Sequence, residues 1–244
     1  MRFTIDDLRF VIVDPLVKIS LGAAVYTTPW DNYLVATRVW WYDPQLVTGL
    51  VIGWVPIEEY TFFVVQPIMA GLWLFALARY VRAGEQGSVA SLTRVGVRFR
   101  VVAVGITAVI WLIMIGILAA GWKPGTYLAL ELGWALPPIM LQLGFGADIL
   151  WQHRRLVFWT IVPMTLYLSG ADALAIHWGM WTIDPAQSLH VLLGGVLPVE
   201  EFLFFLLTNV LLTFGVVLLI SAESHERIKQ LRHRWQSLAA SGSA

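Results

Sequence analysis

Long apolar runs, separated by short polar segments, dominate the pattern along the chain. A membrane-spanning helix needs about 20 mostly apolar residues, and several runs reach that length: residues 101–120, 127–145, 156–175 and 201–221. A less regular apolar run at residues 10–28 predicts a first span. The pattern therefore predicts a helical protein that crosses a membrane many times.

The apolar segment at residues 46–80 is too long for one straight span, and Pro56 lies inside it. Proline breaks a helix interior but is well placed in a first helical turn. We therefore expect a short helix before Pro56 and a spanning helix over residues 57–80. The predicted fold is all-α integral membrane, a polytopic helix bundle of about six to eight spans. The higher count applies if the regions before Pro56 and Pro198, each of which begins a Pro-x-Glu-Glu motif, form extra spans.

The chain repeats part of its own sequence. Residues Pro56, Glu58, Glu59, Phe62 and Phe63 recur 142 residues later as Pro198, Glu200, Glu201, Phe204 and Phe205. Upstream, residues Asp31, Trp40, Asp43 and Pro44 recur 141 residues later as Asp172, Trp181, Asp184 and Pro185. Internal repeats in membrane proteins often place a site where the two halves meet. We therefore expect two internal repeats with a site between them.

The repeat divides the chain into four parts. Residues 1–90 are the expected first repeat, 91–150 the connecting transmembrane helices, 151–222 the second repeat and 223–244 a polar tail. Residues 84–91 read as a flexible linker. The tail is expected to be partly helical, with a disordered end in LAASGSA.

Basic residues gather in three polar segments. They are Arg79, Arg82, Arg94, Arg98 and Arg100 in the first, His153, Arg154 and Arg155 in the second, and Arg227, Lys229, Arg232 and Arg234 in the tail. The positive-inside rule places all three, including the C-terminal tail, in the cytoplasm. Both Pro-x-Glu-Glu helices would then start near the outer side and run inward, as parallel repeats.

Composition supports a multi-pass protein of the cell membrane, in contact with membrane lipid. Hydrophobic residues make up 58% of the chain, charged residues only 13%, and the mean hydropathy is +0.72; a soluble domain has about 25% charged residues. Net charge is zero, which gives no basic surface for nucleic acid. The absence of cysteine excludes disulfides and thiolate metal sites.

The paired glutamates are the main candidate chemistry, because an ionisable residue at membrane depth is costly and usually functional. Acidic residues also favour the first turn of any helix, but that alternative does not account for their recurrence with phenylalanines at the same offsets. On a helix, Glu58 neighbours Phe62 and Glu59 neighbours Phe63. A carboxyl group in a dry pocket can keep its proton, and an aromatic face stabilises a cation. The sequence leaves open which glutamate holds the proton.

Structural roles can also account for the other polar residues near the predicted spans. Asp31 and Asn32 follow Trp30 at the expected outer end of the first span, where helix capping is an alternative role. The two Asp-Pro pairs are typical of turns. Glu131 and Asp148 could be buried hydrogen-bonding groups. No metal-binding histidine spacing and no dinucleotide-binding glycine motif is present, so neither a metal nor a cofactor is expected.

Four motifs carry a family resemblance. The stretches TTPWDNYLV, WWYDPQLVTG, VPIEEYTFF and LPVEEFLFF resemble the membrane-integral lycopene cyclases of bacteria, archaea and fungi, in the form with both halves fused. The resemblance covers nearly the whole chain. It implies a carotenoid-biosynthesis enzyme, an intramolecular lyase or isomerase, that cyclises the ends of lycopene to β-rings through γ-carotene to β-carotene. The implied chemistry is acid/base catalysis without net redox change.

The resemblance also assigns roles to residues that match the motifs. The implied catalytic acid/base groups are Glu58, Glu59, Glu200, Glu201 and Asp31. The implied substrate-binding residues are Phe62, Phe63, Phe204, Phe205, Trp30 and Asn32. Asp172 departs from the pattern because it lacks the adjacent tryptophan and asparagine. The two halves are therefore not expected to be equal in catalysis.

Alternative functions stay open at this stage. Within the same family, the chain could be a C50 carotenoid cyclase or a monocyclase. A membrane carotenoid-cleaving oxygenase is disfavoured because few histidines lie near spans. From another class, a proton-coupled membrane transporter also fits repeated halves and acidic residues in the membrane, and so does a structural scaffold. A homo-oligomer is compatible with the sequence.

Overall fold

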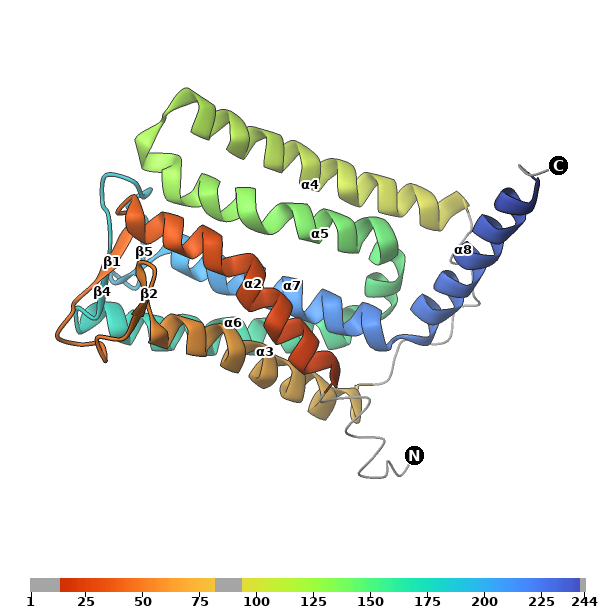
Figure 1. The fold of residues 1–244 in the computed structure, drawn as a ribbon, viewed down its shortest axis with the longest axis horizontal. Coiled ribbons are helices and arrows are strands. Elements are labelled where there is room, and N and C mark those ends of the chain that lie inside the picture. Colours follow the sequence, from red (N-terminus) through yellow and green to blue (C-terminus); the bar gives the residue numbers. More distant parts are fainter. Residues whose placement is uncertain (1–13, 82–93, 242–244) are drawn as a thin grey trace.

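The computed structural model describes residues 14–81 and 94–241, which are mostly helical (Figure 1). The helices are α2 (Asp14–Ala36), α3 (Ile57–Ala78), α4 (Arg94–Ala120), η2 (Lys123–Gly125, a 3-10 turn), α5 (Thr126–Gln152), α6 (Arg154–His177), α7 (Val199–Ile220) and α8 (Ala222–Ser241). Short strands form at one end of the bundle: β1 (Trp40–Tyr42), β2 (Val51–Ile52), β3 (Val55–Pro56), β4 (Trp181–Ile183), β5 (Leu192–Leu193) and β6 (Leu197–Pro198).

Five helices in the described part of the chain are long and apolar enough to cross a membrane. They are Ile57–Ala78, Gly96–Ala120, Lys123–Gln152, Arg154–His177 and Val199–Ile220. Helix α2 has 23 residues but is less apolar, with Lys18 and Asp31 within it. The first residues of the expected span at 10–28 lie outside the described residues. These helices indicate a membrane protein, as the apolar runs predict.

The prediction of a short helix before Pro56 is wrong, and so is that of extra spans before the Pro-x-Glu-Glu motifs. Residues 51–56 form the hairpin β2–β3, and residues 192–198 form the hairpin β5–β6. Apolar strands this short cannot be told from helix by composition alone. The reading of Pro56 as a helix start is correct, since α3 begins at the next residue.

The order helix, strand, hairpin, helix occurs twice, in α2–β1–β2–β3–α3 and in α6–β4–β5–β6–α7. The two segments meet where β1 and β4 pair antiparallel, with Trp40 opposite Ile183 and Tyr42 opposite Trp181. The second hairpin closes through residues 194–196, whereas the first closes through Gly53 and Trp54 alone. This one extra residue explains why the sequence offset changes from 141 to 142 between the two groups of matched positions.

The loops between strands use the turn chemistry expected from their sequence. The side-chain oxygen of Asp43 accepts the backbone N–H of Gln45 at 2.8 Å, and Asp184 accepts that of Ala186 at 3.0 Å. The Asp-Pro pairs are therefore turn formers, as predicted. Gly53 has a φ of +67°, and a Cβ there would lie 2.2 Å from an oxygen of Asn32. This position requires glycine, because the hairpin turn packs directly on α2.

Helix α4 lies at the edge of the bundle and packs against α5 (Figure 1). Its outer face exposes apolar side chains, among them Val101, Ile106 and Leu112. A row of exposed apolar residues along a helix of this length fits contact with lipid. The main core lies between α3, α5, α6 and α7, where Leu74, Ile149 and Val217 are almost fully buried.

The C-terminal tail is more ordered than predicted, because α8 extends to Ser241 and is anchored to the bundle. The anchor is Arg227, which is 1% exposed and donates two hydrogen bonds to Asp148, at 3.0 and 2.6 Å. Helix α5 kinks at Gly146, whose φ and ψ are non-helical. The kink leaves the carbonyl of Phe145 to accept hydrogen bonds from both Arg227 and Arg100. The linker at 84–91 and residues 242–244 lie outside the described residues.

Candidate active site

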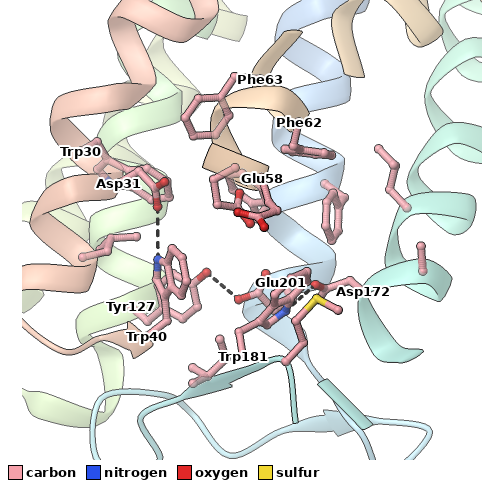
Figure 2. A pocket seen from close by; sticks show the side chains of 18 residues that line it. Trp30, Asp31, Trp40, Glu58, Phe62, Phe63, Tyr127, Asp172, Trp181 and Glu201 are labelled. Atoms are coloured by element: carbon pink, nitrogen blue, oxygen red, sulfur yellow. Dashed lines mark hydrogen bonds between the residues drawn. The ribbon is translucent and has the colours of Figure 1, made fainter. Parts of the chain in front are cut away.

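A cavity of about 290 Å³ lies between the helices, beside the end that carries the strands (Figure 2). Its lining side chains are acidic, aromatic or apolar: Trp30, Asp31, Leu34, Trp40, Glu58, Glu59, Phe62, Phe63, Tyr127, Leu168, Ala171, Asp172, Met180, Trp181, Ile183, Glu201, Phe204 and Phe205. Both sequence halves contribute, and so does α5. None of these described side chains is basic, so no positive charge on the walls balances the carboxyl groups.

Two aspartate–tryptophan pairs lie on opposite sides of the cavity (Figure 2). The indole N–H of Trp40 donates to Asp31 at 3.2 Å, and that of Trp181 donates to Asp172 at 2.8 Å. Each tryptophan is the first residue of a strand, nine positions after its aspartate near the end of a helix. The strands therefore fix one oxygen of each aspartate, whereas the other oxygen is buried without a hydrogen bond among the described residues.

The first glutamate of each motif binds its own loop. One oxygen of Glu58 accepts the backbone N–H of Thr48 at 2.6 Å, and one oxygen of Glu200 accepts that of Leu189 at 2.6 Å. These bonds tie the segment before each hairpin to the first turn of the following helix. Glu200 is fully buried and does not line the cavity. Glu58 does line it.

The second glutamate of each motif also faces the cavity, and in α7 it is the only one of the pair that does, since adjacent residues on a helix point about 100° apart. Glu59 and Glu201 both line it. The hydroxyl of Tyr127 donates to Glu201 at 2.7 Å, and both side chains are buried. No such bond to Glu59 is found within the described residues. Tyr127 is the second residue of α5, and its backbone N–H donates to Gln187 in the second loop at 2.9 Å.

Five acids line the cavity, Asp31, Glu58, Glu59, Asp172 and Glu201, and like charges on them would repel one another. Glu59 interacts with Asp31 and Glu201 through their charges, and Glu201 also interacts with Asp172. A further acid, Glu131, lies one turn after Tyr127 on α5 and interacts with Glu201. Glu131 is fully buried, as its sequence position suggests, but neither of its oxygens has a hydrogen-bond partner in the described structure. The acids therefore sit close together without a compensating cation on the cavity wall.

Aromatic rings form the remaining walls. Phe62 and Phe205 come from the two halves and meet edge to face, with ring centres 5.9 Å apart. Trp30 stacks on Trp134 at 4.7 Å and on Phe204 at 5.8 Å. Aromatic faces beside a dry cavity attract a positive charge. The site thus combines proton donors and acceptors with surfaces that stabilise a carbocation.

The structure brings most of the predicted site residues into this cavity. Trp30, Asp31, Glu58, Glu59, Phe62, Phe63, Glu201, Phe204 and Phe205 all line it. Glu200 and Asn32 do not. Asn32 instead accepts the backbone N–H of Trp54 at 2.7 Å and donates to the hydroxyl of Tyr60 at 2.9 Å, which holds the first hairpin in place.

Sequence reasoning missed Tyr127. This residue lies outside both repeats, so no matched position marks it. The available signal was a hydroxyl group at the very start of an apolar span. Trp40 and Trp181 appear in the sequence as matched repeat positions, but their bonds to the aspartates require the structure.

Comparison with known proteins gives matches over most of the chain. The family model described as lycopene cyclase matches residues 15–77 and 122–220. The chain is 37% identical over 218 residues to a lycopene beta-cyclase of Halobacterium salinarum, in an alignment that covers 89% of this chain and 85% of the relative. No solved structure matches the chain.

Fungal proteins match over part of their length. The chain is 33% identical to a bifunctional lycopene cyclase/phytoene synthase of Podospora anserina, over 86% of this chain and 35% of the relative. A bifunctional lycopene cyclase/phytoene synthase of Aspergillus oryzae is 32% identical, over 84% and 34%. These matches confirm the resemblance carried by the four motifs, and the chain belongs to the lycopene cyclase family.

Proposed function

We propose that this protein cyclises the ends of lycopene to β-rings by acid/base catalysis, giving γ-carotene and then β-carotene. The observation that carries the proposal is the cavity in which Glu59, Glu201, Asp31 and Asp172 converge among aromatic rings. Lycopene is a hydrocarbon, so its reactive groups are alkenes. Cyclisation of an alkene requires a proton donor, a base and surroundings that stabilise a cation, and the carboxyl groups and aromatic rings of this cavity can supply them. The family and its relatives named as lycopene cyclases support this substrate.

The reaction is an isomerisation in which one proton enters and one proton leaves. A carboxylic acid protonates the terminal alkene and forms a tertiary carbocation. The neighbouring double bond attacks this cation, which closes the six-membered ring and moves the positive charge onto a ring carbon. A carboxylate then removes the proton from the adjacent ring carbon and leaves the β-ring double bond. No electron is gained or lost, so no redox partner is needed.

Glu59 is assigned the role of acid and Glu201 the role of base. Five carboxyl groups line the cavity with no basic side chain on its wall, so they repel one another and are not all ionised at neutral pH. Glu201 accepts a hydrogen bond from Tyr127, which favours its carboxylate form. Glu59 has no such donor among the described residues and is the better candidate to hold the proton.

The aromatic walls stabilise the intermediate. Trp30, Phe62, Phe63, Phe204 and Phe205 line the cavity around the acids. A desolvated cation over an aromatic face gains about 2 kcal/mol, and several faces act on the same charge here. The same walls exclude water, which would otherwise trap the cation as an alcohol.

We also propose that the strand end of the bundle faces outward and the opposite end faces the cytoplasm. Arg79 caps the end of α3, and Arg154 begins α6, both at the end away from the hairpins. Basic residues at membrane-protein ends favour the cytoplasmic side. The cavity then lies near the outer surface of the cell membrane.

The test is expression of the chain in a bacterial host that accumulates lycopene, followed by chromatography of extracted carotenoids. The proposal predicts conversion to β-carotene, with γ-carotene as intermediate. The Glu59→Gln variant should leave lycopene unchanged while reaching the membrane at the wild-type level. Unchanged lycopene with wild-type protein in the membrane would refute the proposal, and γ-carotene as the end product would limit it to a monocyclase.

A further inference from the structure

A second cavity, of about 270 Å³, lies next to the acid cavity between α2, α3, α5 and α7. Its lining includes Gly22, Ala23, Pro67, Pro138 and Leu212. Phe63 and Phe204 line both cavities. The two cavities are therefore neighbours that share two aromatic side chains.

The second cavity reaches the outside of the bundle along α2. Two hydrogen bonds join α2 to α5 near the strand end, from Tyr26 to the carbonyl of Trp134 at 2.8 Å and from Trp30 to that of Leu130 at 3.1 Å. Further from the strands, Gly22 is exposed and a Cβ placed on it would meet no atom within 4 Å. The opening thus lies at the surface of α2, beside the exposed apolar side chains of Leu21 and Val25.

Several polar side chains in this cavity form hydrogen bonds, whereas the side-chain oxygen of Gln142 and the indole N–H of Trp134 are buried without a partner among the described residues. The amide of Gln66 donates to the hydroxyl of Thr208 at 2.8 Å, and this hydroxyl donates to the carbonyl of Phe204 at 2.9 Å. The amide of Gln142 donates to the carbonyl of Leu211 at 3.0 Å. No charged side chain lines the cavity in the described structure. Its chemistry suits a long hydrocarbon rather than a polar or ionic ligand.

We propose that this second cavity binds the conjugated polyene chain of the substrate while one of its ends reacts in the acid cavity. The inference rests on the proposed function and adds a binding site and an entry route. A linear C40 molecule cannot be enclosed in the acid cavity alone, so its chain must leave past some part of the wall. The shared residues Phe63 and Phe204 mark that exit. Substrate then enters sideways from the lipid between α2 and α5.

The test fills the second cavity without touching the acids. Gly22→Trp adds a large ring at the opening, and Ala23→Leu adds a smaller group beside it. Gly105→Trp is the matched control, because Gly105 is an exposed helical glycine on α4 that also has open space around it and lines neither cavity. Conversion of lycopene is measured in the accumulating host, with the membrane level of each variant determined alongside.

Binding of lycopene is measured separately, as its retention by protein that cannot catalyse cyclisation. Each substitution is combined with Glu201→Gln, the protein is purified in detergent, and bound carotenoid is quantified by its visible absorption. We expect Gly22→Trp to lower both conversion and retention at least tenfold, Ala23→Leu to lower them less, and Gly105→Trp to stay within twofold of the parent.

The outcomes separate the two proposals. Wild-type conversion and retention in both Gly22→Trp and Ala23→Leu would overturn the polyene site and leave the proposed function intact. Lost conversion with unchanged retention would also overturn it, because the chain would then be held elsewhere. A wild-type protein that does not convert lycopene would refute the proposed function itself, and this inference with it.

Discussion

The two neighbouring glutamates at the start of α7 allow a sharp test. The same substitution should lower the catalytic rate at Glu201 but lower only the stability at Glu200. Glu201 faces the acid cavity and accepts the hydroxyl of Tyr127, whereas Glu200 is buried behind it and accepts the backbone N–H of Leu189. Glutamine keeps the shape and one acceptor oxygen at either position. It removes only the ability to take up or release a proton.

For Glu201→Gln the expected loss is catalytic. General acid/base groups contribute about 10²–10⁴ in rate, which is about 3–5.5 kcal/mol of activation free energy. Tyr127 can still donate to the amide oxygen, so folding should be little affected. For Glu200→Gln the acceptor oxygen of the 2.6 Å bond to Leu189 is kept. The new amide N–H₂ replaces an oxygen that is buried without a partner in the described structure, and a buried unsatisfied donor costs about 1–3 kcal/mol, so this variant should lose stability by about that amount.

The assay compares both variants with wild type in membranes supplied with lycopene. Initial rates of ring formation are followed by chromatography, and thermal stability is followed on the purified proteins. Glu200→Gln should cyclise within about threefold of wild type and melt a few degrees lower. A Glu200→Gln protein that is as inactive as Glu201→Gln, at equal stability, would refute the assignment of Glu200 to the loop. An active Glu201→Gln would refute the assigned base.

Two further substitutions test the cavity wall and the tail. Tyr127→Phe removes a buried hydrogen bond to Glu201 and should lower the cyclisation rate about tenfold to a hundredfold; rates equal to wild type would show that this bond does not assist the base. Arg227→Met removes the main partner of the partly buried Asp148, whose side chain is 12% exposed, and should destabilise the fold by about 3 kcal/mol. Thermal unfolding measures this loss. Lys229→Met, at an exposed ion pair, is the control and should change stability by less than about 1 kcal/mol.

The sequence predicts the helices well because their signal is local. Apolar length marks every long helix from α3 to α7, and Pro56 marks where α3 begins. The hairpins before Pro56 and Pro198 escape such reasoning, since short apolar strands and short apolar helices have the same composition. Local sequence patterns do not predict the anchoring of the tail either. The contact that anchors it joins Arg227 to Asp148, two residues far apart in the chain, close to the kink at Gly146.

Only part of the candidate site can be predicted from the sequence, because the contacts that complete it join residues far apart in the chain. The repeat identifies Glu58, Glu59, Glu200 and Glu201 as a group, but not that Glu200 alone lies outside the cavity. Its position, with a bond to the backbone N–H of Leu189, is set by the fold of the preceding loop. Tyr127 comes from outside the repeats, and only the packing of α5 against α7 brings it to Glu201.

The central claim is that ring closure begins with a proton from a carboxylic acid and ends with the loss of a different proton. Purified protein in lipid vesicles, given lycopene in deuterated water, tests it directly by mass spectrometry of the product. The account predicts one deuterium in each new ring, because the carboxyl groups exchange with solvent before they donate. A cyclised product without deuterium, or one whose hydrogen count differs from that of lycopene, would contradict the account.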